Sequence, residues 1–250
     1  MFRKKFLLVG ILLVSIAIVI VFAGSSFWME KSAVETSDAT HDIVDETTEE
    51  TGETTDEARN EPSTLEPVEI REYEGQPLSS IDDFRENSIT GPQYITEETY
   101  QLLITGLVAN TLAYTYDDVI SDNTSHQKVV TLHCVEGWEV TILWEGVLVK
   151  ELIKEAGIDP AAKVVIFYAY DGYSTSLPLD YVISHDILMA YKMNGLVLSP
   201  ERGFPFQLVA ESKLGYKWIK WVTEIELSDD VNYRGYWESR GFSNDADWTP

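Results

Sequence analysis

Two short stretches of the sequence hold side chains that could do chemistry. The only cysteine, Cys134, stands in TLHCVEGWEV, after a strand-like run and just before Gly137. A deprotonated cysteine is a nucleophile or a soft metal ligand, whereas a buried one is simply a small apolar side chain. Neighbouring strand residues face opposite ways, so His133 is a poor general base for this thiol. Cys134 is therefore a candidate thiolate, and an inert buried thiol is the alternative.

The second stretch, GYKWIKWV, interleaves two lysines with two tryptophans. Lys217 and Lys220 could contact a phosphate or another anion beside an aromatic wall. The alternative is a half-buried strand whose lysine stems pack over the aromatic rings. The sequence contains no GxGxxG, no P-loop, no HExxH and no EF-hand loop. The residues alone thus offer one thiolate candidate and one anion-contact candidate, far apart in the chain.

Short strands are expected to position these residues. Apolar and β-branched runs predict strands over 100–107, 129–132, 139–143, 164–169, 206–210 and 218–227. Helical spacing occurs over 147–155, ended by Gly157, and over 179–188, with Asp180 as a candidate N-cap. Strands outnumber helices, so the predicted fold class is α+β with a mixed, mainly antiparallel sheet system.

The composition excludes several classes of function. The chain has 42 Asp and Glu against 18 Lys and Arg, a formal net charge of -24. Nucleic-acid binding needs clustered cations, and so does peripheral binding to anionic lipid. A single cysteine excludes an intrachain disulfide framework and the usual cysteine-based zinc sites. No nucleic-acid partner is therefore expected.

The charge divides the chain into three segments. Residues 1–29 contain Arg3, Lys4 and Lys5, followed by an uncharged apolar run over 6–23. This pattern predicts a single-pass membrane anchor with everything after it outside the cytoplasm; a cleaved signal peptide is the alternative. Residues 30–74 are rich in Thr, Glu and Asp and are predicted to be a disordered acidic linker. Residues 75–250 are predicted to form one folded domain.

The order of several motifs resembles a known family. CVEGW at 134–138 is followed by W-x-G-V at 144–147, and later come RGFPFQLVAESKLGYKWIKW at 202–221 and GYWE at 235–238. This order is similar to that of the sulfite-oxidase-like molybdopterin-binding domain. It is most similar to the bacterial and archaeal branch related to methionine-sulfoxide reductase catalytic subunits. The resemblance covers roughly residues 80–238 and implies the mixed sheet fold of that domain.

The resemblance also implies roles for individual residues. Cys134 would give its thiolate to a molybdenum atom that the pterin also holds, and Glu136 would lie near that metal as an acid able to deliver a proton. The residues at the positions that contact the pterin cofactor are Asn87, Gln207, Tyr216, Lys217 and Lys220. Asp171 and Tyr173 would lie at the mouth of the site.

Two departures from the family pattern bear on the substrate. Sulfite oxidases have arginines just after the ligand cysteine, where this chain has Val135, Glu136 and Gly137, so anionic sulfite is not expected. Many relatives also have an arginine two residues after the proline at position 205, where this chain has Gln207. An amide can hydrogen-bond a phosphate but brings no charge.

The resemblance therefore predicts a molybdopterin-dependent oxidoreductase. The expected reaction is oxygen-atom transfer on a small S-oxide- or N-oxide-like substrate, on the outer face of the membrane. The sequence shows no haem-binding signature, so electrons are expected from a separate electron-transfer protein or a membrane carrier. One alternative is a cofactor-free module that keeps the fold and binds a ligand or partner. Another is a sensor in which Cys134 is simply a reactive thiol.

Overall fold

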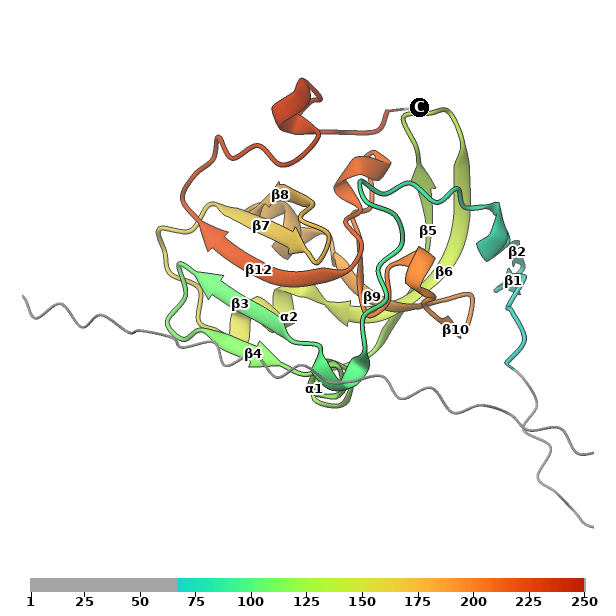
Figure 1. Ribbon diagram of the computed structural model, residues 1–250, viewed down its shortest axis with the longest axis horizontal. Helices are drawn as coiled ribbons and strands as arrows, with labels where there is room; N and C mark the ends of the chain where they lie inside the picture. The colour runs from blue at the N-terminus through green and yellow to red at the C-terminus, as the bar shows by residue number, and fades with distance from the viewer. Residues whose placement is uncertain (1–66, 250) are drawn as a thin grey trace, which may run out of the picture. The chain divides into compact units, whose positions relative to one another are not determined.

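The cysteine follows one arm of a long, curved β hairpin (Figure 1). A computed structural model of the protein describes residues 67–249. The predicted anchor over 1–29 and residues 30–66 of the predicted linker lie outside the described residues. Residues 67–74 of that linker are described, and they differ from the predicted disorder: Glu72–Tyr73 pairs with Gln76–Pro77 as a short ribbon, and Glu69 accepts from the Ile81 backbone amide. The hairpin pairs β5 (His126–His133) with β6 (Glu139–Leu148) in antiparallel register, with His133 opposite Glu139. Its turn therefore brings Cys134 to the end of a sheet.

The first sheet extends this hairpin on one side only. Its strand order is β10-β9-β6-β5, and β11 also pairs with β9; all of these pairs are antiparallel. The added strands are β9 (Leu188–Met193), β10 (Leu196–Val197) and β11 (Gln207–Val209). Because β11 begins at Gln207, this sheet also positions a predicted cofactor contact.

The second sheet has the order β4-β3-β12-β7-β8. Its strands are β3 (Leu102–Gly106), β4 (Leu112–Tyr114), β7 (Val164–Ala169), β8 (Ser174–Pro178) and β12 (Val222–Ser228). Only the β12–β3 pair in this sheet is parallel. A separate two-stranded ribbon joins β1 (Glu72–Tyr73) and β2 (Gln76–Pro77). The described residues therefore confirm the predicted α+β class with a mixed, mainly antiparallel sheet system.

Within residues 67–249, three short α-helices connect the strands. They are α1 (Tyr116–Ser121), α2 (Val149–Glu155) and α3 (Leu179–Ser184). Thr115 begins α1 with a capping box, because its side chain accepts from the Asp118 backbone amide while Asp118 accepts from the Thr115 amide. The expected N-cap at Asp180 is wrong: α3 begins after Pro178, and Asp180 lies in the first turn, where its charge still favours the helix dipole.

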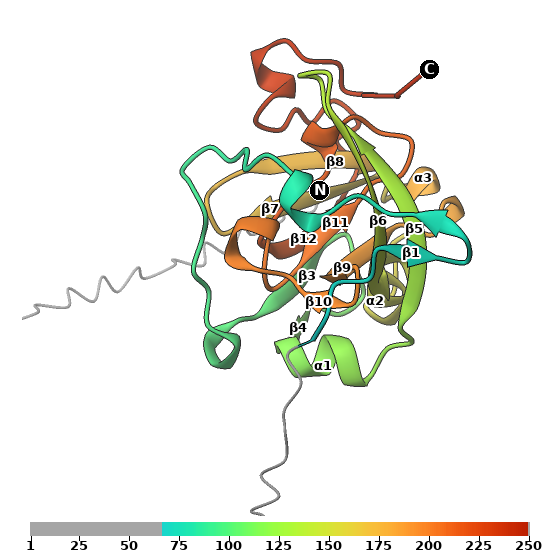
Figure 2. The same ribbon diagram turned by 90° about the vertical axis from the view of Figure 1, so that its right-hand side faces the viewer.

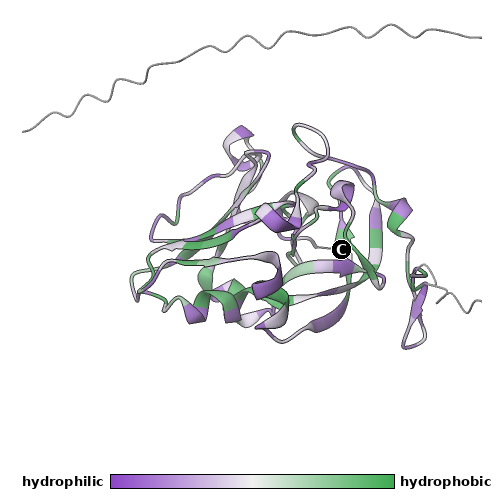
Figure 3. Ribbon diagram, turned by 60° about the horizontal axis from the view of Figure 1, so that its bottom comes forward, coloured by the Kyte–Doolittle hydropathy of each residue, from purple (hydrophilic) through white to green (hydrophobic). Residues whose placement is uncertain are grey.

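One hydrophobic core draws on both sheets. It includes Ile142 and Trp144 of the first sheet and Phe167 and Ile225 of the second, all fully or almost fully buried. Figure 3 shows hydrophobic residues running along the strands, with hydrophilic residues gathered in the connections. Among residues 67–249, none of the helices has the length and apolar character that a bilayer crossing requires.

The GYKWIKWV stretch is not the strand predicted from residue 218 onward. Gly215–Lys217 forms a 3-10 turn, and β12 begins only at Val222. The backbone of Trp221 has a φ of 54°, in the left-handed region, which interrupts an extended strand at that point. The side chains of this stretch therefore do not alternate between two faces as they would in a strand, and Lys217 and Lys220 can point in different directions.

Gly146 provides a test of how closely the two central strands of the first sheet approach. Its added methyl group would lie 2.7 Å from the Cα of Ala190 on β9, so Gly146→Ala should destabilise the domain by about 3 kcal/mol. Gly172→Ala is the control: it has a φ of 84° but meets nothing within 4 Å, and should cost about 1 kcal/mol. Urea unfolding followed by tryptophan fluorescence measures both losses. Equal losses would contradict the packing argument.

Candidate functional site

One cavity of about 380 Å³ collects most of the residues predicted to do chemistry. Its walls come from the segment 84–89, the turn after β5, the stretches 201–207 and 215–221, and residues near the C-terminus. The site residues predicted from the sequence that line it are Asn87, Cys134, Glu136, Asp171, Tyr173, Gln207, Tyr216 and Lys220. Segments distant in sequence thus meet at one place.

Cys134 occupies the first position of the hairpin turn. Its backbone amide donates to the Trp138 carbonyl (2.9 Å), and the Gly137 amide donates back to the Cys134 carbonyl (3.0 Å). Gly137 has a φ of 83°, which glycine adopts without strain. Burial raises the pKa of the Cys134 thiol, an effect that the backbone hydrogen bond from Glu136 opposes. The thiol is only partly buried, so it is accessible from the cavity.

Glu136 lies two residues further along the same turn. Its carboxylate accepts from the Trp138 indole N–H (3.1 Å) and from the Asn87 side-chain amide (3.4 Å). The second contact is long and therefore weak. It nevertheless places Asn87, from the segment 84–89, beside the turn that presents the thiol.

Lys220 presents its ammonium group to the cavity. The Nζ atom donates to the Glu86 carboxylate (2.6 Å) and to the Glu201 carbonyl (3.1 Å), and it lies 4.4 Å from the Trp221 ring centroid. Burial lowers the pKa of Lys220, and the hydrogen bond to Glu86 opposes that shift. Of the two predicted lysines, this one is placed to meet an anion.

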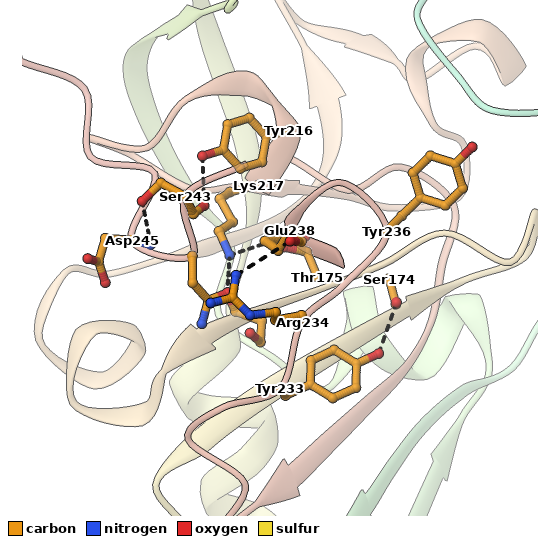
Figure 4. Close-up of polar contacts among 12 residues, drawn as sticks. Ser174, Thr175, Tyr216, Lys217, Tyr233, Arg234, Tyr236, Glu238, Ser243 and Asp245 are labelled. Atoms are coloured by element: carbon orange, nitrogen blue, oxygen red, sulfur yellow. Dashed lines mark hydrogen bonds and ion pairs between the residues drawn. The ribbon is translucent and has the colours of Figure 1, made fainter. Parts of the chain in front are cut away.

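Lys217 turns away from the cavity and into the protein. It is fully buried, and its Nζ donates to the Glu238 carboxylate (2.5 Å) and to the Ser176 carbonyl (2.9 Å). Figure 4 shows Lys217 and Glu238 pointing at one another, with Thr175 donating to the same carboxylate (2.6 Å). Lys217 is not among the residues that line the cavity. Its hydrogen bonds to Glu238 and Ser176 instead link the C-terminal segment to β8.

The C-terminal segment supplies part of the cavity wall. Trp237 and Phe242 line the cavity and pack on each other with ring centroids 5.2 Å apart. Tyr216 bonds to this segment, donating its hydroxyl to the Ser243 carbonyl (2.8 Å), and burial raises its pKa to about 12. Further on, Trp248 stacks on His133 beside the hairpin turn, where Figures 1 and 2 both place the end of the described chain.

Tyr173 fixes the opposite side of the same stretch. Its hydroxyl donates to the Tyr216 carbonyl (2.7 Å), and its pKa is raised, mainly by burial. Asp171, two residues before it, caps the turn by accepting from the Tyr173 amide (2.9 Å), and burial raises the pKa of its carboxyl. Both residues line the cavity.

Sequence reasoning missed two arginines that line the cavity. Arg85 comes from the segment 84–89, and Arg202 comes from a 3-10 turn over Pro200–Arg202. Arg202 donates to the Phe84 carbonyl (3.1 Å) and lies 5.2 Å from the Phe84 ring centroid. A lone arginine beside an acidic neighbour gives no sequence signal, and only the fold shows that both line the same cavity as Cys134.

Comparison with known proteins identifies the family. Residues 89–237 match the model of the oxidoreductase molybdopterin binding domain. The chain therefore belongs to this family of oxidoreductases, and molybdopterin is the family's cofactor. The match covers the hairpin turn with Cys134 and the stretch with Lys220, and it begins just after Asn87.

Individual relatives agree with this membership. The chain is 33% identical over 152 residues to "Uncharacterized oxidoreductase YuiH" of Bacillus subtilis, which covers 60% of this chain and 76% of YuiH. It is 32% identical over 146 residues to "Putative protein-methionine-sulfoxide reductase subunit YedZ1" of Azospira oryzae, covering 58% of this chain and 55% of YedZ1.

A solved structure shares the fold. The sulfane dehydrogenase SoxCD from Paracoccus pantotrophus superposes with a TM-score of 0.55 and 25% identity. The match covers 58% of this chain and 42% of the SoxCD chain. Since the chain spans about half of YedZ1 and less than half of SoxCD, these comparisons define the domain rather than the whole activity of either protein.

The cavity fits the family's cofactor on its own chemistry. A thiol suits a soft metal ligand, an ammonium suits a phosphate, and tryptophan faces suit a flat ring system. Cys134, Lys220 and the rings of Trp138 and Trp221 all line the same cavity. In addition, the Ser88 hydroxyl is buried there with no hydrogen-bond partner among the described residues, as a polar group awaiting a ligand would be.

The buried pair of Lys217 and Glu238 should be coupled in stability. Lys217→Met or Glu238→Leu leaves one buried charge without its partner, at a cost of about 3 kcal/mol. The double variant should lose clearly less than the sum of the two single losses. Lys150→Met is the control, because its more exposed pair with Asp186 should contribute at most about 1 kcal/mol. Urea unfolding gives all four values, and additive losses would contradict the coupling.

Proposed function

We propose that the protein is a molybdopterin-dependent oxidoreductase that transfers an oxygen atom from a small, neutral S-oxide- or N-oxide-like substrate. The observation that supports this most directly is the meeting of Cys134 and Lys220 in one cavity of a family member. The thiol and the ammonium lie far apart in the domain sequence, so the fold rather than chance spacing brings them together.

The chain's own residues would hold the cofactor at both ends. Cys134 would bind the metal through its sulfur, and Lys220 would contact the phosphate, with Tyr216 and Gln207 lining the space beside them. When bound, the molybdenum cofactor supplies two-electron redox chemistry. A metal cation would also stabilise the Cys134 thiolate, which burial alone disfavours.

Glu136 is the candidate for handling protons. Reduction of an S-oxide to a thioether consumes two protons and two electrons and releases water. The Glu136 carboxylate lies in the same turn as Cys134 and is oriented by Trp138. In its protonated form, one of its oxygens could donate to a departing oxygen atom. Asn87 would keep this side chain directed into the cavity.

The charges that line the cavity favour a neutral substrate. Arg85, Arg202 and Lys220 are balanced by Glu136, Asp171 and Glu201. A site that selects a small anion such as sulfite needs an excess of cations. YedZ1, whose printed name refers to a protein-methionine-sulfoxide reductase subunit, supports a sulfoxide as the substrate.

The proposal also includes a source of electrons and a location for the domain. Two electrons per turnover would come from a separate electron-transfer protein or a membrane carrier. The uncharged run over 6–23, preceded by three cations, supports an anchored protein whose domain lies outside the cytoplasm. Protease digestion of intact cells tests this arrangement, because an outer domain is cleaved while the membrane remains closed.

A cofactor-free binding module is the second candidate. The observations that favour it are the uncharged amide of Gln207 and the pairing of Lys220 with Glu86, which already engages the ammonium group assigned to the phosphate. Burial raises the pKa of Cys134, the opposite of what a reactive sensor thiol needs. Metal analysis separates the enzyme from the module.

The first measurement is molybdenum and pterin content of the full chain from a host that makes and inserts the cofactor. We expect about one molybdenum per chain, lost in Cys134→Ser because an alcohol is a much weaker ligand for a soft metal. Folded wild-type protein without molybdenum, from a host that loads a related domain in parallel, would refute the enzyme.

Lys220→Met should weaken retention of the pterin without unfolding the domain. We expect at least about a tenfold faster loss of cofactor on dilution, because one charge-assisted hydrogen bond to phosphate is removed. Lys154→Met, an exposed lysine on α2, is the matched control and should retain the cofactor as the wild type does. Pterin fluorescence after release measures the loss. Indistinguishable rates for the two variants would remove Lys220 from the binding site.

A further inference from the structure

Lys220 occupies a site built around its side chain. Gly203 makes room for the lysine stem, since a methyl group there would lie 3.0 Å from both Cβ and Cγ of Lys220. The ammonium rests over the Trp221 ring and donates to the Glu201 carbonyl. The side chain is 14% exposed, so its position is set by the surrounding protein rather than by solvent.

A carboxylate from a different part of the chain already uses this ammonium. Glu86, which lies 134 residues earlier, accepts from Lys220 Nζ at 2.6 Å. Its side chain is 31% exposed, so the pair lies at the boundary between the cavity and solvent. With Glu86 and Glu201 both bound, two of the three ammonium protons of Lys220 are engaged.

The segment that holds Glu86 is fixed firmly at one end only. Phe84 packs edge-on against Trp138 and Trp144, and its carbonyl accepts from Arg202. Beyond Glu86, the side chain of Asn87 makes one hydrogen bond to the rest of the described chain, the long contact of 3.4 Å with Glu136. The Glu86 side chain can therefore leave Lys220 while Phe84 remains anchored.

We propose that Glu86 is a built-in competitor that the phosphate of the cofactor must displace from Lys220. This inference rests on the proposed function. A carboxylate and a phosphate repel each other when both approach one ammonium group. Arg85 and Arg202 also line the cavity, but Lys220 is the cation that the Glu86 carboxylate already bonds. Displacement of Glu86 therefore sets the affinity of the phosphate end. Until the cofactor binds, the Glu86 carboxylate keeps the largely buried ammonium group of Lys220 paired.

The Ser88 hydroxyl is a second group that could interact with the phosphate when it replaces Glu86 at Lys220. This hydroxyl lines the cavity, two residues after Glu86, and is buried without a hydrogen-bond partner among residues 67–249. A movement of the segment that releases Lys220 also moves this hydroxyl. The incoming anion gives it an acceptor, which offsets part of the ion pair that is lost.

The test measures anion binding by the full chain made in a host that lacks the cofactor. Inorganic phosphate is titrated calorimetrically into the wild type, Glu86→Gln and the control Glu98→Gln. Glu98 is an exposed acid in the 3-10 turn over Glu97–Thr99, so its change alters net charge equally. We expect about fivefold tighter phosphate binding by Glu86→Gln, and no change for Glu98→Gln.

A Lys220→Met background shows whether the effect passes through the lysine. In that background, Glu86→Gln should no longer tighten phosphate binding. Equal or weaker binding by Glu86→Gln than by the wild type would overturn the proposal. Tightening that persists without Lys220 would overturn it too, because it would reflect general charge repulsion.

Cofactor loading distinguishes this proposal from the proposed function. If the wild type takes up molybdenum while Glu86→Gln shows unchanged phosphate affinity, the proposed competition between Glu86 and phosphate is wrong. The proposed molybdopterin-dependent function is then still supported. If Glu86→Gln binds phosphate more tightly but neither protein takes up molybdenum in a competent host, Glu86 still competes for Lys220, and the proposed enzyme fails.

Discussion

The arrangement of the site depends on one buried ion pair. Two opposite charges removed from water are tolerated when they meet each other and most of their remaining hydrogen-bonding groups find partners. Lys217 and Glu238 meet each other, and Ser176 and Thr175 supply further partners. The second carboxylate oxygen of Glu238, Oε2, has no partner among the described residues. The pair joins the 3-10 turn that precedes Lys220 to β8 and to the C-terminal segment. If these elements shifted, a charge would be left unpaired inside the protein.

The same constraint explains why two similar lysines do different work. Lys217 and Lys220 are three residues apart, a spacing that places side chains on one face in a helix. Here the chain forms one 3-10 turn and then bends at Trp221, so one ammonium group is buried while the other faces the cavity. A buried cation in an ion pair and a cation that lines the cavity are thus separated by a single turn of backbone.

Much of the fold could be predicted from local patterns. β7 reads VVIFYA and has the buried pattern of a central strand, and the cysteine was correctly expected at the end of a strand. Strand β9 was not predicted from the sequence, because Tyr191 and Lys192 interrupt its apolar run. The partner of Lys217 could not be predicted either, because Glu238 is 21 residues away and only tertiary packing brings the two charges together. Motif order, rather than periodicity, pointed to most of the predicted site residues that do line the cavity.

The residues that line the cavity are spread along the domain sequence, and this constrains the order in which the domain is synthesised, folds and binds a ligand. The cavity needs Asn87 and Ser88 from the start of the domain, Cys134 from the middle, and Trp237 and Phe242 from near its end. No partly synthesised domain that stops short of residue 242 encloses the full cavity. During synthesis on the ribosome, folding must therefore join the earliest and latest parts of the domain before the cavity can take up a ligand. On this geometry, the complete cofactor site forms only after the last residues of its wall have been synthesised.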